Sequence, residues 1–291
     1  MKSGAQQVKN YLSLVKFSHT VFALPFALIG FFLALRHTSA PFSGRLFIEV
    51  ILCMIFARSA AMAFNRYIDR HIDAINPRTA RREIPAGVIA STHAFWFVIL
   101  NSVLFMAVTF FINPICFYLS PIALLIVLGY SYTKRFTALC HIVLGIGLSL
   151  APIGAYLAVT GVFSLLPILY SFTVLFWVSG FDMIYAMQDE DFDRSNKLRS
   201  IPAWLGKRNT LILSDVFHVL SALLVISAGL YAGFGIWYWI GTAIFTGLLI
   251  YQHLLVKPDD LSRVNLAFMT TNGVASVLFS VFVLIELMLS R

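Results

Sequence analysis

The sequence predicts an all-α membrane protein with nine transmembrane helices around a central cavity and with cytosolic cap segments. The chain has 291 residues, of which 59% are hydrophobic and 12% are charged, and its mean hydropathy is +0.86. This balance excludes an ordinary soluble globular protein. In addition, apolar stretches of about 20 residues, the length at which a helix crosses a bilayer, recur along the whole chain.

Nine such stretches follow one another. They lie near Phe17–Leu35, Leu46–Phe64, Phe95–Ile112, Ile115–Tyr132, Leu139–Val159, Leu165–Met187, Leu211–Leu230, Ile236–Val256 and Leu266–Leu289. The first stretch is long for the hydrophobic region of a signal peptide, and eight more follow it. We therefore expect it to be retained as a transmembrane helix.

The basic residues predict the orientation of these helices. Of the 21 Lys and Arg residues, 17 lie before the first stretch or after the second, fourth, sixth and eighth. Cytosolic loops retain Lys and Arg, so we expect a multi-pass protein of the cell (inner, cytoplasmic) membrane with a cytosolic N-terminus and an external C-terminus. The net charge of +8 follows from this topology, with attraction to anionic membrane lipid, and gives no reason to expect nucleic-acid binding. Cys53, Cys116 and Cys140 lack metal-ligand spacing and are expected to be packing residues.

The two long polar segments on the predicted cytosolic side are roughly residues 65–93 and 188–210. Each runs from a D-x3-D pair into an Arg and an Ile-Pro, and the pairs are 120 residues apart whereas the prolines are 117 apart. This offset predicts an internal duplication of about four helices within a single integral-membrane domain, residues 1–291. Breaks at Gly87 and Gly206 predict a short cap helix in each segment, over the mouth of a shared cavity.

Polar and acidic side chains recur at steps of three and four residues in both segments, which places them on one helical face. The first set is Asn65, Asp69 and Asp73, and the second is Asp182, Tyr185, Asp189 and Asp193, whereas Asp191 points elsewhere. One such pair alone is usually a solvated helix end. Two pairs at equivalent places, beside arginines, favour Mg²⁺ and a diphosphate, because facing carboxylates repel unless a cation bridges them and Mg²⁺ shares oxygen ligands with phosphates.

Two charges lie within the predicted spans. Asp182 is two turns deeper than Asp189, and Arg58 precedes Asn65 by seven residues on the same face. Because burying a charge in a membrane is costly, we expect both to line the cavity; the alternative is a structural pair with each other or with a neighbouring polar group. Lys134 and Arg135, taken by themselves, are better explained as simple anchors at the cytosolic surface.

The chain resembles the UbiA-type intramembrane aromatic prenyltransferases over nearly its whole length. The run Asn65, Asp69, Asp73, Arg78, Arg82, Pro85 and Gly87 is similar to the first motif of that family with its arginine-rich tail. The run Asp182, Tyr185, Ala186, Asp189 and Asp193 is similar to the second motif. The segment Tyr130–Arg135 resembles the short Y-x-x-x-K neighbourhood of the family.

This resemblance implies Mg²⁺-dependent transfer of a polyprenyl group from its diphosphate to a hydroxylated aromatic acid. The implied metal ligands are Asn65, Asp69, Asp73, Asp189 and Asp193. The implied substrate-binding residues are Arg58, Asn65, Arg78, Arg82, Lys134 and Tyr185, and the catalytic ones are Asp69, Asp182 and Asp189. Within this scheme Arg58 is a candidate for binding an acceptor carboxylate and Asp182 for orienting or deprotonating the phenol. The implied partners are the two substrates and membrane lipid, without an obligate protein partner.

The acceptor is predicted from a closer resemblance. Residues 16–26 and residues 58–65 look like a branch described as 4-hydroxybenzoate polyprenyltransferase, some of whose members use 1,4-dihydroxy-6-naphthoate in a menaquinone route. Both acceptors are hydroxylated aromatic acids. We favour 4-hydroxybenzoate, in respiratory (ubiquinone) biosynthesis, with the naphthoate as the alternative.

Other classes of membrane protein fit less well. A transporter or cation channel would place charges at the bilayer midplane with access from both sides. Here the acidic and basic residues gather at the cytosolic ends of the predicted helices. A structural scaffold leaves the matched acidic stripes unexplained, and the signature of phosphatidyl-alcohol transferases is absent. Enzymes of the same superfamily that prenylate protoheme or chlorophyll share the motifs, so only the acceptor pocket separates them.

Overall fold

The computed structural model describes residues 4–16 and 22–289. Within these ranges the regular structure is helical, apart from one isolated antiparallel bridge between Lys257 and Asp260. The start of the first predicted stretch, residues 17–21, lies outside the described part of the chain. The chain divides into two compact units, which are residues 1–20 with 48–132 and residues 21–47 with 133–291.

Among the described residues, seven helical segments are long and apolar enough to cross a membrane. They are α3 (Gly44–Ile68), α5 (Ser91–Ile112), α6 (Pro114–Thr133), α7 (Cys140–Thr160), α8 (Leu165–Ala186) continued to Ser195, α10 (Ile201–Ala232), and the π-helical η3 (Leu266–Thr271) with α12 (Asn272–Leu289). Two further predicted stretches fall on α2 (Leu24–Thr38), which is apolar but shorter, and on α11 (Ile236–Leu255). Every predicted stretch therefore overlaps a helix within the described residues, and the number of nine spans stays a prediction.

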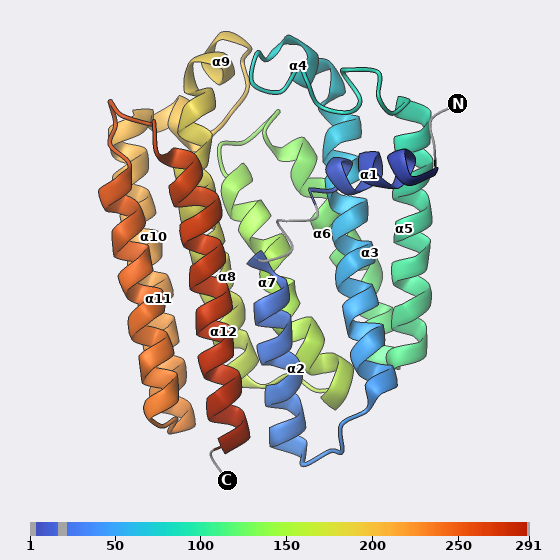
Figure 1. The fold of residues 1–291 in the computed structure, drawn as a ribbon, viewed down its shortest axis with the longest axis vertical. Helices are drawn as coiled ribbons and strands as arrows, with labels where there is room; N and C mark the ends of the chain where they lie inside the picture. The colour runs from blue at the N-terminus through green and yellow to red at the C-terminus, as the bar shows by residue number, and fades with distance from the viewer. Residues whose placement is uncertain (1–3, 17–21, 290–291) are drawn as a thin grey trace. The chain divides into compact units, whose positions relative to one another are not determined.

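The first unit joins α1 (Gly4–Leu14), most of α3, α4 (Arg70–Ile75), α5 and α6. α1 lies across α3 and α5 rather than along them (Figure 1). Its Leu14 is fully buried and packs in a small cluster with Ala63 of α3 and Val98 of α5. Ser13 Oγ donates a hydrogen bond to Glu83 Oε1, so α1 is also attached to the loop that follows α4.

The second unit joins α2 with α7 to α12, and α8 packs between α7 and α10. The long helices α8, α10, α11 and α12 run side by side in Figure 1. At their centre the ring of Trp177 lies 5.4 Å from that of Phe26 and 5.9 Å from that of Phe245, between ring centroids. Aromatic pairs of this kind bury large apolar areas and hold α8 against α2 and α11.

A chain of buried polar groups joins the same helices. The indole Nε1 of Trp177 donates to Asn272 Oδ1 at 2.7 Å, and Asn272 Nδ2 donates to Gln252 Oε1 at 2.9 Å. Trp177, Gln252 and Asn272 are fully buried. Each donor therefore has an acceptor in a place without water, which fixes the register of α8 against α11 and α12.

The helices α2 and α7 touch through a glycine, which leads to a stability prediction. A Cβ added to Gly30 would collide with the backbone carbonyl of Pro152, whereas a Cβ added to Gly154 of α7 meets nothing within 4 Å. Gly30→Ala is therefore expected to lower the melting temperature of the purified protein. Gly154→Ala is the matched control and should be neutral or slightly stabilising, because alanine favours helix by about 1 kcal/mol over glycine. Equal melting temperatures for the two variants would contradict this close contact.

Both predicted glycine breaks occur. Gly87 has φ of 69° and Gly206 has φ of 76°, a left-handed conformation that glycine adopts without strain. The break at Gly206 separates the first turn of α10 from the rest of that helix. Each polar segment also contains a six-residue helix, α4 in the first and α9 (Glu190–Ser195) in the second. The two acidic sets therefore lead into short helices and sharp turns.

Candidate active site

The first acidic set follows one nearly continuous helical path from α3 into α4. The amide of Asp69 donates to the carbonyl of Asn65 at 2.9 Å, and that of Asp73 to the carbonyl of Asp69 at 2.7 Å. The Asn65 side chain donates to Asp69 Oδ2 at 3.1 Å. The predicted stripe of Asn65, Asp69 and Asp73 is therefore present on one face of the helix.

Asp73 is the most deeply held member of this stripe. Its carboxylate is 4% exposed, and Arg82 Nη1 lies 2.7 Å from Oδ1. Its other oxygen, Oδ2, is buried without a hydrogen-bond donor in the described part of the chain. A buried anionic oxygen without a donor is costly, so this atom is suited to a cation or to a water held by one.

The second acidic set lies at the end of α8, in the 3₁₀ turn η2 (Met187–Asp189) and in α9. Asp193 is fully buried; Lys134 Nζ lies 2.6 Å from Oδ1, and Ser200 Oγ donates to Oδ2 at 2.8 Å. Lys134 therefore holds Oδ1 and Ser200 holds Oδ2, so both oxygens of this carboxylate have a donor beside them. Asp73 and Asp193 are thus both buried carboxylates with a cation at one oxygen, and they differ in that the second oxygen of Asp73 has no donor within the described residues.

Lys134 reaches Asp193 because the backbone on either side is tied together. The amide of Arg199 donates to the carbonyl of Lys134 at 2.8 Å, and Arg199 Nη1 donates to the carbonyl of Phe136 at 2.8 Å. These two bonds join the segment after α6 to the segment before α10. Lys134, for which the sequence pattern was weak, therefore forms an ion pair with a residue of the second acidic set.

Asp182 is paired with a histidine that the sequence analysis did not single out. Nδ1 of His141, at the start of α7, lies 2.7 Å from Asp182 Oδ2. His141 is 4% exposed, whereas the Asp182 side chain keeps 22% of its surface exposed. The partner of Asp182 in the second unit is thus His141, 41 residues earlier in the chain. No local spacing indicates such a partner.

The remaining predicted residues lie in varied environments. Arg58 Nη2 donates to the carbonyl of Lys16 at 3.3 Å, and its Nε is buried without a hydrogen-bond partner in the described residues. Tyr185 stacks on Phe268, with ring centroids 4.1 Å apart. Arg78 is exposed in the turn after α4, and its amide donates to Asn76 Oδ1. Arg58 and Tyr185 are therefore fixed by neighbours, whereas Arg78 faces outwards.

One further cation was missed by sequence reasoning. Arg66 directly follows Asn65, is 4% exposed, and lies within electrostatic reach of Asp73 and Glu83. Its Nε is also buried without a hydrogen-bond partner among the described residues. The sequence analysis treated Arg66 only as a mark of orientation. Its position directly after Asn65, the first residue of the stripe, was the signal that could have found it.

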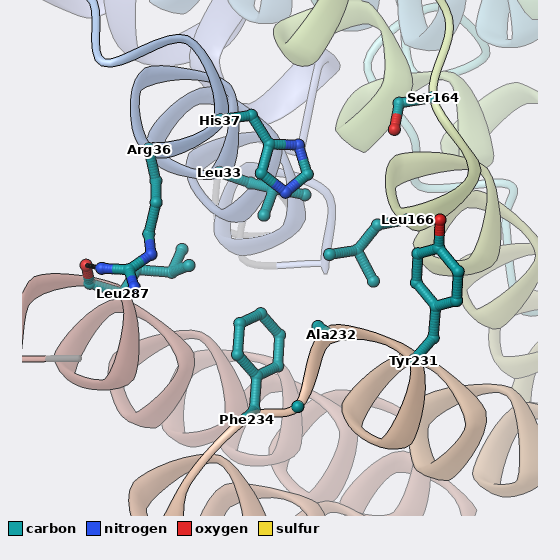
Figure 2. A pocket seen from close by; sticks show the side chains of 10 residues that line it. Leu33, Arg36, His37, Ser164, Leu166, Tyr231, Ala232, Phe234 and Leu287 are labelled. Atoms are coloured by element: carbon teal, nitrogen blue, oxygen red, sulfur yellow. Dashed lines mark hydrogen bonds between the residues drawn. The ribbon is translucent and has the colours of Figure 1, made fainter. Parts of the chain in front are cut away.

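A pocket of about 470 Å³ in the second unit lies away from these residues. It is lined by the ends of α2, α8, α10 and α12. The polar side chains of Arg36, His37 and Tyr231 line it together with apolar side chains such as Leu166 (Figure 2). Leu166 and Asp182 lie at opposite ends of α8, about 24 Å apart at 1.5 Å per residue. None of the predicted site residues lines this pocket.

The acidic residues fit a magnesium site shared with a phosphate. Within the described ranges no group of three or more His, Cys, Asp or Glu side chains is close enough to hold a metal alone. Mg²⁺ commonly binds through one or two carboxylates and completes its shell with waters and substrate phosphates. The buried Oδ2 of Asp73, which has no donor within the described residues, and the all-oxygen donor set suit that chemistry.

Comparison with known proteins decides the family. A family model described as the UbiA prenyltransferase family matches residues 23–274. The chain belongs to the UbiA prenyltransferase family. It is thus an integral, multi-pass membrane enzyme that transfers prenyl groups, which confirms the resemblance stated from the motifs.

Curated relatives and solved structures agree with this family. The 4-hydroxybenzoate octaprenyltransferase of Aliivibrio fischeri MJ11 is 31% identical over 233 residues, covering 80% of each chain. That of Nitrosomonas europaea is 30% identical, covering 79% of this chain and 78% of its own. A UbiA homologue from Aeropyrum pernix K1, solved in the apo state, is 33% identical with a TM-score of 0.83, covering 92% of this chain and 98% of its own.

A more distant UbiA homologue shares the fold. The Archaeoglobus fulgidus protein, solved with DMAPP and Mg²⁺, is 19% identical with a TM-score of 0.74, and the match covers 96% of this chain and 99% of that one. The all-helical fold expected for a UbiA enzyme is therefore confirmed.

Proposed function

We propose that this UbiA enzyme transfers a polyprenyl group from polyprenyl diphosphate to 4-hydroxybenzoate, as a step of respiratory quinone biosynthesis. The observation that carries the proposal is the pair of buried carboxylates, Asp73 and Asp193, each with a cation beside it. The curated relatives, named 4-hydroxybenzoate octaprenyltransferases, support the acceptor. The Archaeoglobus homologue bound to DMAPP and Mg²⁺ supports the donor and the metal.

In this proposal nine helices enclose one central cavity that opens to the cytosol. Both acidic sets and the N-terminus face the cytosolic side of the inner membrane, α4 and α9 belong to the cap segments, and the C-terminus is external. The distribution of Lys and Arg supports this orientation. A cavity of this kind excludes water from a reactive allylic cation and lets the polyprenyl tail lie in lipid.

The diphosphate end of the donor is held by the two acidic sets. Asn65, Asp69, Asp73, Asp189 and Asp193 are the proposed Mg²⁺ ligands, with Asp69 and Asp189 at the reacting diphosphate. When bound, Mg²⁺ supplies Lewis-acid activation of the leaving group. Arg78, Arg82 and Lys134 add positive charge for the departing diphosphate, and Tyr185 contributes to the wall that holds the substrate.

The acceptor is held by the two intramembrane charges. Arg58 binds the carboxylate of the acid, for which its buried Nε offers an unused donor. Asp182 accepts the phenol proton, and the ring carbon ortho to the oxygen attacks the allylic carbon. The bond from that carbon to the diphosphate oxygen breaks, and its electron pair leaves with the diphosphate. The departed diphosphate then takes the ring proton, and the oxygen regains its proton from Asp182, which restores an aromatic phenol.

The role of Arg58 makes a prediction about two Michaelis constants. Arg58→Met is expected to raise KM for the aromatic acid by about tenfold or more, because a hydrogen bond to a charged group is worth about 1.5–3 kcal/mol. KM for the polyprenyl diphosphate should stay near its wild-type value. Steady-state kinetics with each substrate varied in turn measure both. Equal increases in the two constants would contradict a role specific to the acceptor.

The proposed function is tested with purified protein in detergent or lipid, with Mg²⁺ and a labelled polyprenyl diphosphate. 4-Hydroxybenzoate and 1,4-dihydroxy-6-naphthoate are compared as acceptors, and Asp69→Ala is the control. We expect prenylation of 4-hydroxybenzoate that is lost in the control. Transfer to the naphthoate alone would reassign the enzyme to the menaquinone route, and no transfer to either acid would overturn the acceptor class.

A further inference from the structure

His141 occupies a distinctive place beside the proposed site. It is buried where the start of α7 meets α8 and the first turn of α10. One ring nitrogen faces Asp182 and the other faces the backbone of Ile201. A buried ionisable group near a proposed catalytic carboxylate needs an explanation, because its burial alone is unfavourable.

The hydrogen bonds assign the state of the ring. The backbone amide of Ile201 can only donate, and it lies 3.4 Å from Nε2, so Nε2 is the acceptor. A neutral imidazole with one accepting nitrogen carries its proton on the other, so Nδ1–H donates to Asp182 Oδ2 at 2.7 Å. Asp182 is then the acceptor of this bond and His141 is neutral.

From this arrangement we infer that His141 is a positioning residue, which fixes Asp182 by one oxygen so that the other, Oδ1, is presented to the acceptor phenol. The inference rests on the proposed function, in which Asp182 receives the phenol proton. Within the described residues Oδ1 has no hydrogen bond, and the Asp182 side chain is 22% exposed. The oxygen proposed to accept the phenol proton, Oδ1, is thus the one that His141 leaves without a hydrogen bond.

The same geometry offers no proton path from Nε2 of His141 to the backbone amide of Ile201. A relay needs the second ring nitrogen to pass a proton onwards, but Nε2 faces an amide that cannot accept one. Ser200, directly before Ile201, holds Asp193 Oδ2. Neighbouring residues of one segment therefore contact His141 Nε2 and Asp193.

The kinetic test compares two substitutions that separate positioning from packing. In His141→Asn the side-chain amide nitrogen takes the place of Nδ1 and still donates to Asp182, whereas His141→Leu fills the space without a donor. We expect the Leu variant to lose about 10- to 100-fold in kcat, since a misplaced catalytic group costs this much, and the Asn variant to keep most of it. KM for the polyprenyl diphosphate should not change in either variant.

A packing role predicts the reverse order, because Asn leaves a cavity where Leu does not. Activity of the Leu variant equal to or above that of the Asn variant would therefore overturn the inference. In an Asp182→Asn background, adding His141→Leu should cost nothing further, since the histidine acts through that carboxylate. A full additional loss there would also overturn it. Melting temperatures of all variants identify any that fail to fold.

A spectroscopic measurement does not depend on the acceptor. With ¹⁵N-labelled histidine, the ring signals of His141 are identified by their absence from the Leu variant. We expect Nδ1 protonated and Nε2 unprotonated, and a changed Nδ1 signal in Asp182→Asn; a ring protonated at Nε2 would overturn the inference. Wild-type protein that prenylates neither acid would refute the proposed function, whereas an active wild type with the wrong variant order or tautomer would refute the inference alone.

Discussion

Asp189→Asn is expected to lower kcat/KM for prenyl transfer by about 1,000-fold, which corresponds to about 4 kcal/mol of lost transition-state stabilisation. Asp189 is 7% exposed at the end of α8, in the second acidic set. Asn has nearly the same shape but lacks the negative charge that makes a carboxylate a strong ligand for Mg²⁺. The substitution should therefore preserve the fold and remove the proposed ligand.

Asp191 provides the matched control for this prediction. It lies two residues further along, in α9, and its side chain is exposed. Asp191→Asn should keep wild-type turnover and wild-type Mg²⁺-dependent binding of labelled polyprenyl diphosphate. Asp189→Asn should lose both the turnover and the binding. If the two variants behave alike in the binding assay, the acidic stripe is not the diphosphate site.

Lys134→Met should lower the stability of the metal-free protein by about 2 kcal/mol. Asp193 is fully buried, and removal of its cation leaves a carboxylate held by Ser200 alone. Breaking a fully buried ion pair costs about 3–5 kcal/mol; the Lys134 side chain is 33% exposed, which reduces the value. The melting temperature in the presence of a chelator measures the effect.

The same variant tests whether Asp193 is a metal ligand. In wild-type protein Mg²⁺ must compete with Lys134 for this carboxylate, whereas in Lys134→Met it meets an unpaired anion. Added Mg²⁺ is therefore expected to raise the melting temperature more in the variant than in wild type. Lys197→Met, at an exposed lysine of the same polar segment, is the control and should resemble wild type. An equal Mg²⁺ effect in wild type and Lys134→Met would remove Asp193 from the ligand set.

The helices and the acidic stripes could be predicted because both depend on local sequence. A bilayer requires long apolar helices, so hydropathy alone placed α3, α5 and α8. The spacing of Asn65, Asp69 and Asp73 is a property of one helix, and it was found as predicted. The breaks at Gly87 and Gly206 were likewise readable, since few other residues adopt that backbone conformation.

The partners of these residues could not be predicted. Lys134 and Asp193 are 59 residues apart, and no periodicity links them. His141 lies at the first turn of a hydrophobic helix, where a lone histidine carries no pattern, and only the packing of α7 against α8 reveals its contact with Asp182. α1 was not predicted as a separate helix, because its apolar residues are too few for a span and its burial depends on α3 and α5.

The contact between α2 and α7 also has a consequence for how the protein is made. α2 leaves the ribosome about 100 residues before α7, which at about 5–20 residues per second is a delay of roughly 5 to 20 seconds. During that time Gly30 and Phe26 have neither Pro152 nor Trp177 to pack against. A short apolar helix must therefore stay in the bilayer, exposed to lipid or to the insertion machinery, until the later helices arrive.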